Sequence, residues 1–460
     1  MVLGKKVAFV CNDCGGEHNK WQGQCAHCGA WNTLEEIRLS ENSSSIRQVQ
    51  NLYKPSNNNT EKSSPKILAD VQLEEISRIA TTFGELDRVL GGGLVPGSVT
   101  LLGGNPGAGK STLLLQLACN LSDSIDIFYV TGEESLQQVA LRAKRLALPH
   151  KNLHLMSETK LQDILSVAND FKPTVLVIDS IQVMYLDELS SAPGGVSQVR
   201  ECSAVLTQFA KQSGTVLILV GHVTKDGLLA GPKVLEHIVD CSLLLEGDAN
   251  NRFRTLRSQK NRFGAVNELG VFAMTDRGMR EVKNPSAIFL DRRGLDTPGS
   301  VVTIVWEGTR PLLVEIQALI DPNARENPRR LAVGLDQNRL SMLLAVLHRH
   351  GGVNIVSHDI YTNVVGGIRV LETSTDLALI FATVSSLRDF SLPSEMAVFG
   401  EVGLSGEVRP VQNGQERLLE ARKHGFKRAL IPVGNAPKTP IEGLDIEAVS
   451  NVSQALSAIY

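Results

Sequence analysis

A glycine-rich stretch from Gly104 to Ser111, which reads Gly-Asn-Pro-Gly-Ala-Gly-Lys-Ser, restricts the possible folds of this chain more than any other feature. It matches the phosphate-loop pattern. It follows an apolar run at 99–102 that predicts a buried strand, and it opens a stretch at 111–121 that predicts a helix. In this context backbone N–H groups can surround phosphates, and the helix N-terminus favours negative charge. The alternative is a glycine-rich turn that binds nothing.

Two residues of this loop have expected roles. Lys110 would reach the β- and γ-phosphates, and Ser111 would ligate Mg²⁺. A second apolar strand, predicted at 175–179, ends in Asp179, which fits the acidic residue that holds Mg²⁺ through water. The residues predicted to bind the nucleotide and its metal are Gly104, Asn105, Pro106, Gly107, Ala108, Gly109, Lys110, Ser111 and Asp179.

Hydrolysis also needs a group that activates water. Glu133 and Glu134 follow a strand predicted at 127–131, and we favour Glu133 as the base. The alternative is an acidic pair that only stabilises a helix N-terminus. His222 follows a strand predicted at 216–220, where it would sense the γ-phosphate or be an ordinary polar residue at a strand end. From 81 to 282, apolar runs alternate with helical patterns, which predicts a parallel sheet with crossover helices.

Four of the seven cysteines form two Cys-x-x-Cys pairs near the N-terminus. Two such pairs can present four thiolates to one tetrahedral Zn²⁺, which leaves no open position for catalysis. Redox dithiols and coincidence are the alternatives, and we treat His18 and His27 as non-ligands. The predicted zinc ligands are Cys11, Cys14, Cys25 and Cys28.

Composition and patterning divide the chain into four parts. We expect a zinc module at 1–35, a polar flexible linker at 36–70, an α/β ATPase domain at 71–283, and an α+β domain of hairpins and helices at 284–460. The net charge of 46 − 49 = −3 excludes a wholesale basic nucleic-acid coat protein, although a local basic stripe remains possible. Without a signal peptide, a membrane-spanning run or an even number of cysteines, the chain is expected in the cytoplasm.

A basic stretch lies near the end of the predicted ATPase domain. It contains Arg252, Arg254, Arg257, Lys260 and Arg262 within eleven residues and includes no acidic residue. Strand spacing predicts that all of these except Arg257 share one face. A solvated strand face is one interpretation. The other is a cationic finger that stabilises transition-state charge on a nucleotide bound by a neighbouring subunit.

The zinc module, the phosphate loop, the segment Lys260-Asn-Arg-Phe-Gly264 and the C-terminal region together resemble the RadA (Sms) family of bacterial DNA repair proteins. The resemblance covers the whole chain except the linker. It implies a RecA-like ATPase core related to hexameric DnaB-type helicases, and a DNA-dependent ATPase that promotes branch migration in homologous recombination. The cofactors implied are ATP, Mg²⁺ and Zn²⁺. The partners implied are single-stranded and branched DNA, the recombinase RecA and five further copies of the chain, with no membrane.

The same resemblance assigns roles to individual residues. Glu133 matches the catalytic glutamate, and Lys260 and Arg262 match a paired finger that reaches a neighbour's ATP. Segments 180–199 and 224–240 correspond to DNA-facing loops, in which Lys225 and Lys233 are candidate DNA contacts.

The C-terminal region is similar to the proteolytic domain of Lon, which uses a Ser–Lys dyad. Ser374 falls at the nucleophile position, but Gln415 stands where the lysine would be, and glutamine cannot act as a base. Asp376 occupies a position that is small in the proteases. We therefore predict no peptidase activity. Two alternatives to the motor remain open: an ATP-switched scaffold that binds DNA, and an ATP-dependent Ser protease.

Overall fold

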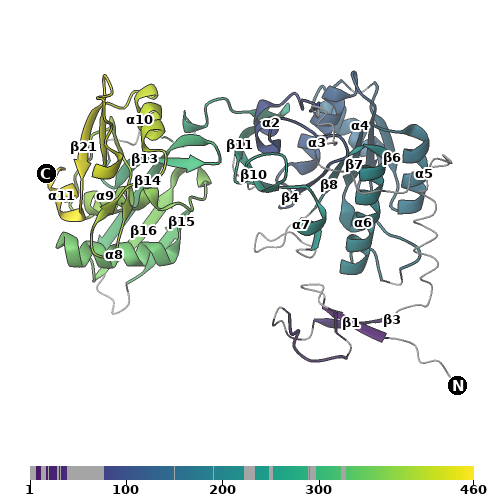
Figure 1. The fold of residues 1–460 in the computed structure, drawn as a ribbon, viewed down its shortest axis with the longest axis horizontal. Coiled ribbons are helices and arrows are strands. Elements are labelled where there is room, and N and C mark those ends of the chain that lie inside the picture. Colours follow the sequence, from purple (N-terminus) through teal and green to yellow (C-terminus); the bar gives the residue numbers. More distant parts are fainter. Residues whose placement is uncertain are drawn as a thin grey trace, which may run out of the picture. The chain divides into compact units, whose positions relative to one another are not determined.

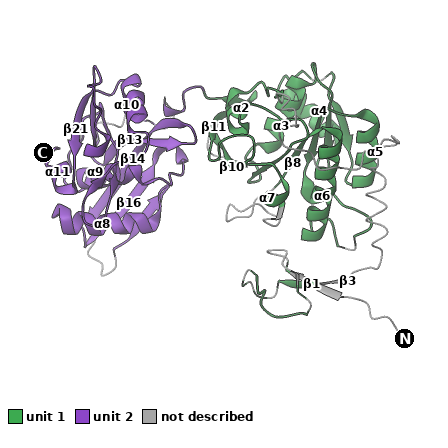
Figure 2. Cartoon of the chain, viewed as in Figure 1, with its two compact units in different colours: residues 1–282 green, residues 283–460 purple. Residues whose placement is uncertain are grey.

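The computed structural model divides into two compact units, residues 1–282 and 283–460 (Figure 2). The structure describes residues 7–11, 17–18, 20–27, 29, 31, 33–38, 77–149, 151–189, 191–221, 234–247, 252–287, 290, 297–322 and 328–459. None of the helices in these ranges is long and apolar enough to cross a membrane.

The N-terminal module contains a small antiparallel sheet. Its strand order is β2 (Glu17–His18), β1 (Val7–Cys11) and β3 (Leu34–Arg38). Cys11 ends β1, and it is buried together with Cys25 and Leu34. Two thiols thus form much of the described interior of a module that is too small for an ordinary apolar core.

The rest of the first unit is built on a nine-stranded sheet of order β12-β11-β10-β9-β4-β8-β7-β5-β6 (Figure 1). Its strands are β4 (Val99–Gly104), β5 (Ile127–Thr131), β6 (His154–Ser157), β7 (Val175–Asp179), β8 (Val216–Val220), β9 (Cys241–Glu246), β10 (Phe253–Asn261), β11 (Leu269–Thr275) and β12 (Gly278–Glu281). Its helices are α2 (Gly84–Leu90), α3 (Lys110–Leu121), α4 (Leu136–Arg145), α5 (Leu161–Phe171), α6 (Val196–Ser213) and α7 (Val234–Ile238).

The six strands from β9 to β6 are parallel, as the alternation of apolar runs and helical patterns predicts. Successive residues of these strands point to opposite faces, and both faces are covered. Helices α2 and α3 pack on one face, and α5 and α6 pack on the other. Beyond the predicted parallel strands, β10, β11 and β12 extend one edge of the sheet with antiparallel pairs.

The second unit contains a seven-stranded sheet of order β15-β16-β14-β13-β17-β20-β21. Its strands are β13 (Ser300–Glu307), β14 (Arg310–Pro322), β15 (Arg330–Val333), β16 (His358–Val364), β17 (Met396–Val398), β20 (Arg428–Pro432) and β21 (Asp445–Val449), with a separate hairpin of β18 (Glu401–Val402) and β19 (Val408–Arg409). Its helices are α8 (Gln337–Gly351), α9 (Asp376–Leu387), α10 (Gly414–Lys423) and α11 (Val452–Ser457).

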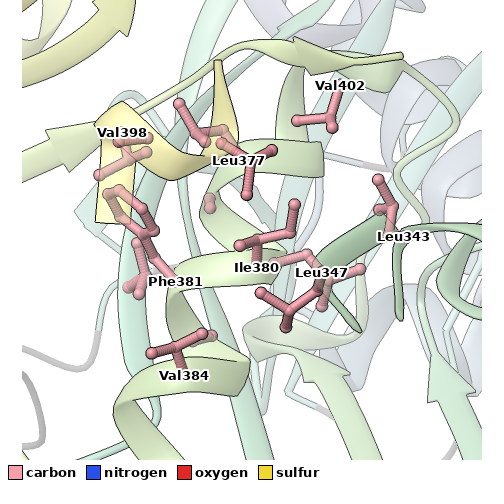
Figure 3. Packing of buried hydrophobic residues seen from close by; sticks show 14 of the residues in the cluster. Leu343, Leu347, Leu377, Ile380, Phe381, Val384, Val398 and Val402 are labelled. Carbon is pink, nitrogen blue, oxygen red and sulfur yellow. The ribbon is translucent and has the colours of Figure 1, made fainter. Parts of the chain in front are cut away.

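Helices α8, α9 and α11 cover one face of this second sheet, and α10 covers part of the other. Figure 3 shows the larger of the two cores, in which side chains of α8 and α9 meet those of the sheet. Helix α9 is buried nearly all round: ten of its twelve residues are buried. It therefore fixes the position of the residues at its N-terminus, Ser374 and Asp376.

Candidate functional site

The phosphate loop connects the carboxyl end of β4 to the N-terminus of α3. Two of its glycines leave no room for a side chain. A Cβ at Gly104 would lie 2.4 Å from the carbonyl oxygen of Leu245, and one at Gly109 would lie 2.3 Å from Met279 Cε. Gly109 also has φ of 106°, a left-handed conformation that favours glycine. The backbone of β9 and the side chain of Met279 on β12 thus support the loop, while its tip stays exposed.

Lys110 is the first residue of α3 and is buried at the base of the loop. Its Nζ donates to the carbonyl oxygens of Gly104, at 2.6 Å, and Asn105, at 3.1 Å. Burial lowers the pKa of this ammonium group, and the nearby carboxylates of Asp179 and Glu133 oppose that shift. The buried ammonium group is therefore held against the first two residues of the loop.

A buried arginine also supports the phosphate loop. The sequence pattern indicated it only as one member of the basic stretch, with no link to the loop. Arg254, on β10, is 3% exposed, and its Nε donates to the carbonyl oxygen of Ala108 at 3.0 Å. A second bond runs from Nη1 to the carbonyl oxygen of Phe253, at 2.9 Å. A permanent positive charge behind the loop adds to the field that favours phosphate.

Asp179 ends β7, next to β5, and lies on the same sheet face as α3. Burial raises the pKa of its carboxyl group, while hydrogen bonds from Tyr129 and Ser111 act in the opposite direction. The Ser111 hydroxyl and the Asp179 carboxylate therefore lie side by side. Oxygen donors of this kind suit Mg²⁺.

The structure separates the roles of the two consecutive glutamates. Glu133 accepts a hydrogen bond from the hydroxyl of Ser180, the residue after Asp179, and its charge is felt by Lys110. Glu134 instead forms an ion pair with Arg142 of α4, and its backbone N–H donates to the Thr131 hydroxyl at 3.1 Å. Only Glu133 of the pair thus faces the phosphate loop in these contacts, which suits the base assignment.

Lys260 and Arg262 lie near the amino end of β4, at the opposite end of that strand from the phosphate loop. Arg262 pairs with the buried carboxylate of Asp240 at 3.3 Å, and the same carboxylate accepts from the backbone N–H of Val99 at 3.0 Å. Lys260 Nζ donates to the carbonyl oxygens of Glu236, at 2.5 Å, and Val239, at 2.8 Å. Burial and the neighbouring Arg262 lower the pKa of this lysine.

The prediction that Arg254 and Lys260 share a strand face is wrong. A β-bulge shifts the register between Ser258 and Lys260, so that Lys260 pairs with Ser242 and turns to the face of α7. Such a bulge carries no signal in residue spacing alone.

The segment around the two cations is locked to helix α2. Asn261 Nδ2 donates to the carbonyl oxygen of Val89 at 3.1 Å. Gly264 approaches Gly91, the C-cap of α2, so closely that a Cβ there would lie 2.7 Å from Gly91 Cα. Arg78 Nη2 donates to the carbonyl oxygen of Phe263 at 2.9 Å. Asn261 and Gly264 therefore hold the cations in place instead of meeting a ligand.

Of the predicted zinc ligands, the structure describes Cys11 and Cys25, and Cys14 and Cys28 lie outside the described residues. Both described cysteines are buried, at 0% and 1% exposure. Cys25 Sγ lies 3.3 Å from His18 Nε2 and accepts from the backbone N–H of His27 at 3.4 Å. Thiols gathered inside so small a module fit a structural Zn²⁺, with His18 as a hydrogen-bond partner of a ligand.

Other predicted residues also lie outside the described ranges, namely His222, Lys225 and Lys233. Part of the first candidate DNA loop is described, and Gln198 of α6 organises it. Its Nε2 donates to the carbonyl oxygens of Leu186, at 3.1 Å, and Ser191, at 2.9 Å. This loop is therefore tied to the core through one buried amide.

In the second unit, Ser374 is 1% exposed and donates to the carboxylate of Glu372. The cation beside it is Arg417, with Nη1 at 3.2 Å from Ser374 Oγ and at 2.9 Å from Glu372. Gln415, at the lysine position, is exposed on α10. Asp376 is bound by Arg339 through both oxygens. An arginine cannot serve as a base, because it keeps its proton.

Family models match three parts of the chain. A model described as an AAA domain matches residues 65–228, one described as a rubredoxin metal binding domain matches residues 9–36, and one described as subunit ChlI of Mg-chelatase matches residues 314–435. With the sheets above, they confirm the predicted order of a zinc ribbon, a RecA-like ATPase core and a Lon-like C-terminal region.

Curated relatives match over nearly their full length. The DNA repair protein RadA of Salmonella typhimurium is 59% identical over 457 residues, which cover 99% of each chain. The protein of the same name from Bacillus subtilis is 46% identical over 453 residues, 98% of each chain. Among solved structures, a KaiC-like protein of Pyrococcus horikoshii has a TM-score of 0.40 and 20% identity, and it covers 45% of this chain and 99% of its own.

Proposed function

The chain belongs to the RadA family of bacterial DNA repair proteins, and from this premise we propose that it is a DNA-dependent ATPase that works as a hexameric, DnaB-type translocase. It would promote branch migration of recombination intermediates on single-stranded and branched DNA, together with the recombinase RecA. One observation carries the proposal: the phosphate loop lies at the carboxyl end of β4, and the Lys260–Arg262 pair lies near its amino end.

In the proposed reaction each residue of the site has one task. Lys110 and the loop N–H groups bind the β- and γ-phosphates of ATP. Ser111, and Asp179 through water, would hold Mg²⁺, which neutralises phosphate charge when bound. Glu133 orients the attacking water and takes its proton, and the hydroxyl of Ser180 fixes the direction of that carboxylate. The four predicted cysteines would hold Zn²⁺ as a structural ion.

The distance between loop and finger argues for action between subunits. Asp240, which holds Arg262, accepts from Val99 at the start of β4, whereas the phosphate loop begins at Gly104 at its end. Five residue steps of a strand at ~3.3 Å each separate these points by roughly 16 Å. A side chain on the far end of the sheet cannot reach its own nucleotide, but it suits an interface with the next subunit of a ring.

A mixing experiment tests this arrangement. Arg262→Ala and Lys110→Ala should each lose nearly all ATP hydrolysis, while Arg262→Ala keeps ATP binding. In an equimolar mixture, about one quarter of the interfaces would combine an intact loop with an intact finger, so activity should return in part. Arg277→Ala, at an exposed turn between β11 and β12, is the control and should stay active. A mixture as inactive as its components would contradict action between subunits.

ATP hydrolysis with and without single-stranded DNA, at two salt concentrations, tests the role of DNA. Phosphate contacts are weakened by salt, so a translocase should show stimulation that fades as salt rises. A rate that is indifferent to DNA would reject DNA dependence and favour the ATP-switched scaffold.

We further propose that the second unit is a scaffold without peptidase activity. Burial of Ser374 and the presence of Arg417 beside it support this. A nucleophilic serine needs access to substrate and a base that can accept its proton, and Arg417 supplies neither. Peptide cleavage lost specifically in Ser374→Ala would overturn the proposal.

A further inference from the structure

Tyr129 is a polar residue in the buried middle of β5, between the apolar residues Phe128 and Val130. It lies at the middle of β5, it is 2% exposed, and it belongs to the same buried cluster as Leu113 and Leu117 of α3. Strands covered on both faces are normally filled with Val, Ile, Leu and Phe. Phenylalanine would provide the same packing, so the hydroxyl group calls for a separate explanation, since a buried hydroxyl must find a partner.

The partner of that hydroxyl is Asp179. Tyr129 Oη donates to Asp179 Oδ2 at 2.6 Å, inside the core. The strand register explains the reach: Tyr129 pairs with Val177, so Asp179 lies one pair further along on the same face. Thr131 is the direct neighbour of Asp179, but its hydroxyl donates to the backbone of Glu134 at 3.0 Å. The tyrosine thus reaches from the middle of β5 to the carboxylate at the carboxyl end of β7.

We propose that Tyr129 is a positioning residue for the metal-binding carboxylate. By holding Oδ2, it directs the other oxygen of Asp179 towards Ser111 and the water shell of Mg²⁺. This inference rests on the proposed metal role of Asp179. It follows the general behaviour of metal sites, in which groups that orient a ligand matter nearly as much as the ligand, and their loss costs about ten- to a hundredfold in metal affinity.

The test is Tyr129→Phe, which removes one oxygen atom and keeps the ring. Mn²⁺ replaces Mg²⁺ as the probe, and its binding to the protein–ADP complex is followed by electron paramagnetic resonance. We expect Mn²⁺ affinity to fall about tenfold. ADP affinity measured in EDTA should stay within about twofold of the unsubstituted chain, because the loop and Lys110 are untouched. In ATP hydrolysis, the Mg²⁺ concentration for half-maximal rate should rise more than kcat falls.

Two control variants make the result decisive. Tyr361→Phe makes the same chemical change at a half-buried tyrosine of the second unit and should leave Mn²⁺ affinity unchanged. Asp179→Asn should lose Mn²⁺ binding. If Asp179→Asn binds Mn²⁺ normally, the proposed metal role of Asp179 fails. If Asp179→Asn loses Mn²⁺ and Tyr129→Phe does not, only the positioning role is overturned. An equal loss of ADP affinity in EDTA in Tyr129→Phe would indicate general distortion and also overturn it.

Discussion

Each unit of the chain contains a serine hydroxyl that donates a hydrogen bond to a glutamate carboxylate, and the two pairs differ in their surroundings. In the first unit Ser180 donates to Glu133 beside a phosphate loop whose tip is exposed. In the second unit Ser374 donates to Glu372 inside a closed network. The same two residue types therefore occur once at an open nucleotide site and once as part of the interior.

The two serine–glutamate pairs differ in the cation that lies near the glutamate. Lys110 carries its charge on one flexible ammonium group, which donates to two carbonyl oxygens of the loop. Arg417 is 1% exposed and has contacts on all three nitrogens: Nε on Gln412, Nη1 on Ile304, Glu372 and Ser374, and Nη2 on Glu372. A fully engaged guanidinium fixes structure, whereas a lysine that can exchange partners can bind phosphate.

The largest expected effect separates the two glutamates of the first unit. Glu133→Gln should lower kcat for ATP hydrolysis by about 10²- to 10⁴-fold, because the water loses its base, while ATP binding persists. Glu134→Gln breaks only the ion pair with Arg142 and should lower kcat less than about tenfold. Steady-state ATP hydrolysis and equilibrium ATP binding measure both. Equal losses in the two variants would contradict the distinction.

The next effect concerns stability in the second unit. Glu372→Gln leaves the buried Arg417 without its counter-charge and should destabilise this unit by about 3–5 kcal/mol. Ser374→Ala should cost only about 1 kcal/mol. Denaturant unfolding of the full chain measures both. Glu395→Gln, which breaks the exposed pair with Lys427, is the control and should change stability by less than about 1 kcal/mol. A Glu372→Gln chain as stable as this control would show that the network is not structural.

A smaller effect follows from the pKa of Asp179, which burial raises. The ionised form binds metal, so ATP hydrolysis should fall on acidification at a higher pH than an ordinary aspartate would give. The pH dependence of folding stability runs the other way from that of ATP hydrolysis. Because the pKa of Asp179 is raised in the folded chain, its contribution to stability is full below the unfolded pKa and is lost as pH rises through the folded pKa. Asp179→Asn should therefore raise the Tm of nucleotide-free protein at neutral pH. A Tm unchanged or lowered across the pH range would refute this.

The smallest effect concerns the reactivity of cysteines, which differs between the apolar core of the ATPase domain and the zinc module. Burial raises the pKa of Cys119 to about 11, and burial also raises the pKa values of Cys202 and Cys241 to about 12. These thiols should resist a disulfide reagent in the folded chain, since the thiolate is the reactive form. Adding a chelator should expose the cysteines of the zinc module to the reagent. Reaction of all seven cysteines at one rate would contradict this.

Local patterns predicted the parts of the nucleotide site that lie at element ends. Lys110 and Ser111 open a helix, Asp179 ends a strand, and Glu133 follows one, so each could be placed from its own neighbours along the chain. Parallel strands bring their carboxyl ends to one edge, which gathers these residues without further information. Residues that act from a distance were missed, because nothing next to Tyr129 or Arg417 in the sequence indicates a polar partner.

The sequence by itself determined the order of the modules, the strand–loop–helix around the phosphates and the alternation that covers both faces of the sheet, because these depend on short-range periodicity and on glycine. Only the tertiary structure decided which cation meets which carboxylate. The bulge near Lys260 turns it away from Arg254, and the packing of α10 brings Arg417, not Gln415, to Ser374. Such pairings depend on register and on contacts between distant segments, where a shift of one residue moves a side chain to the opposite face.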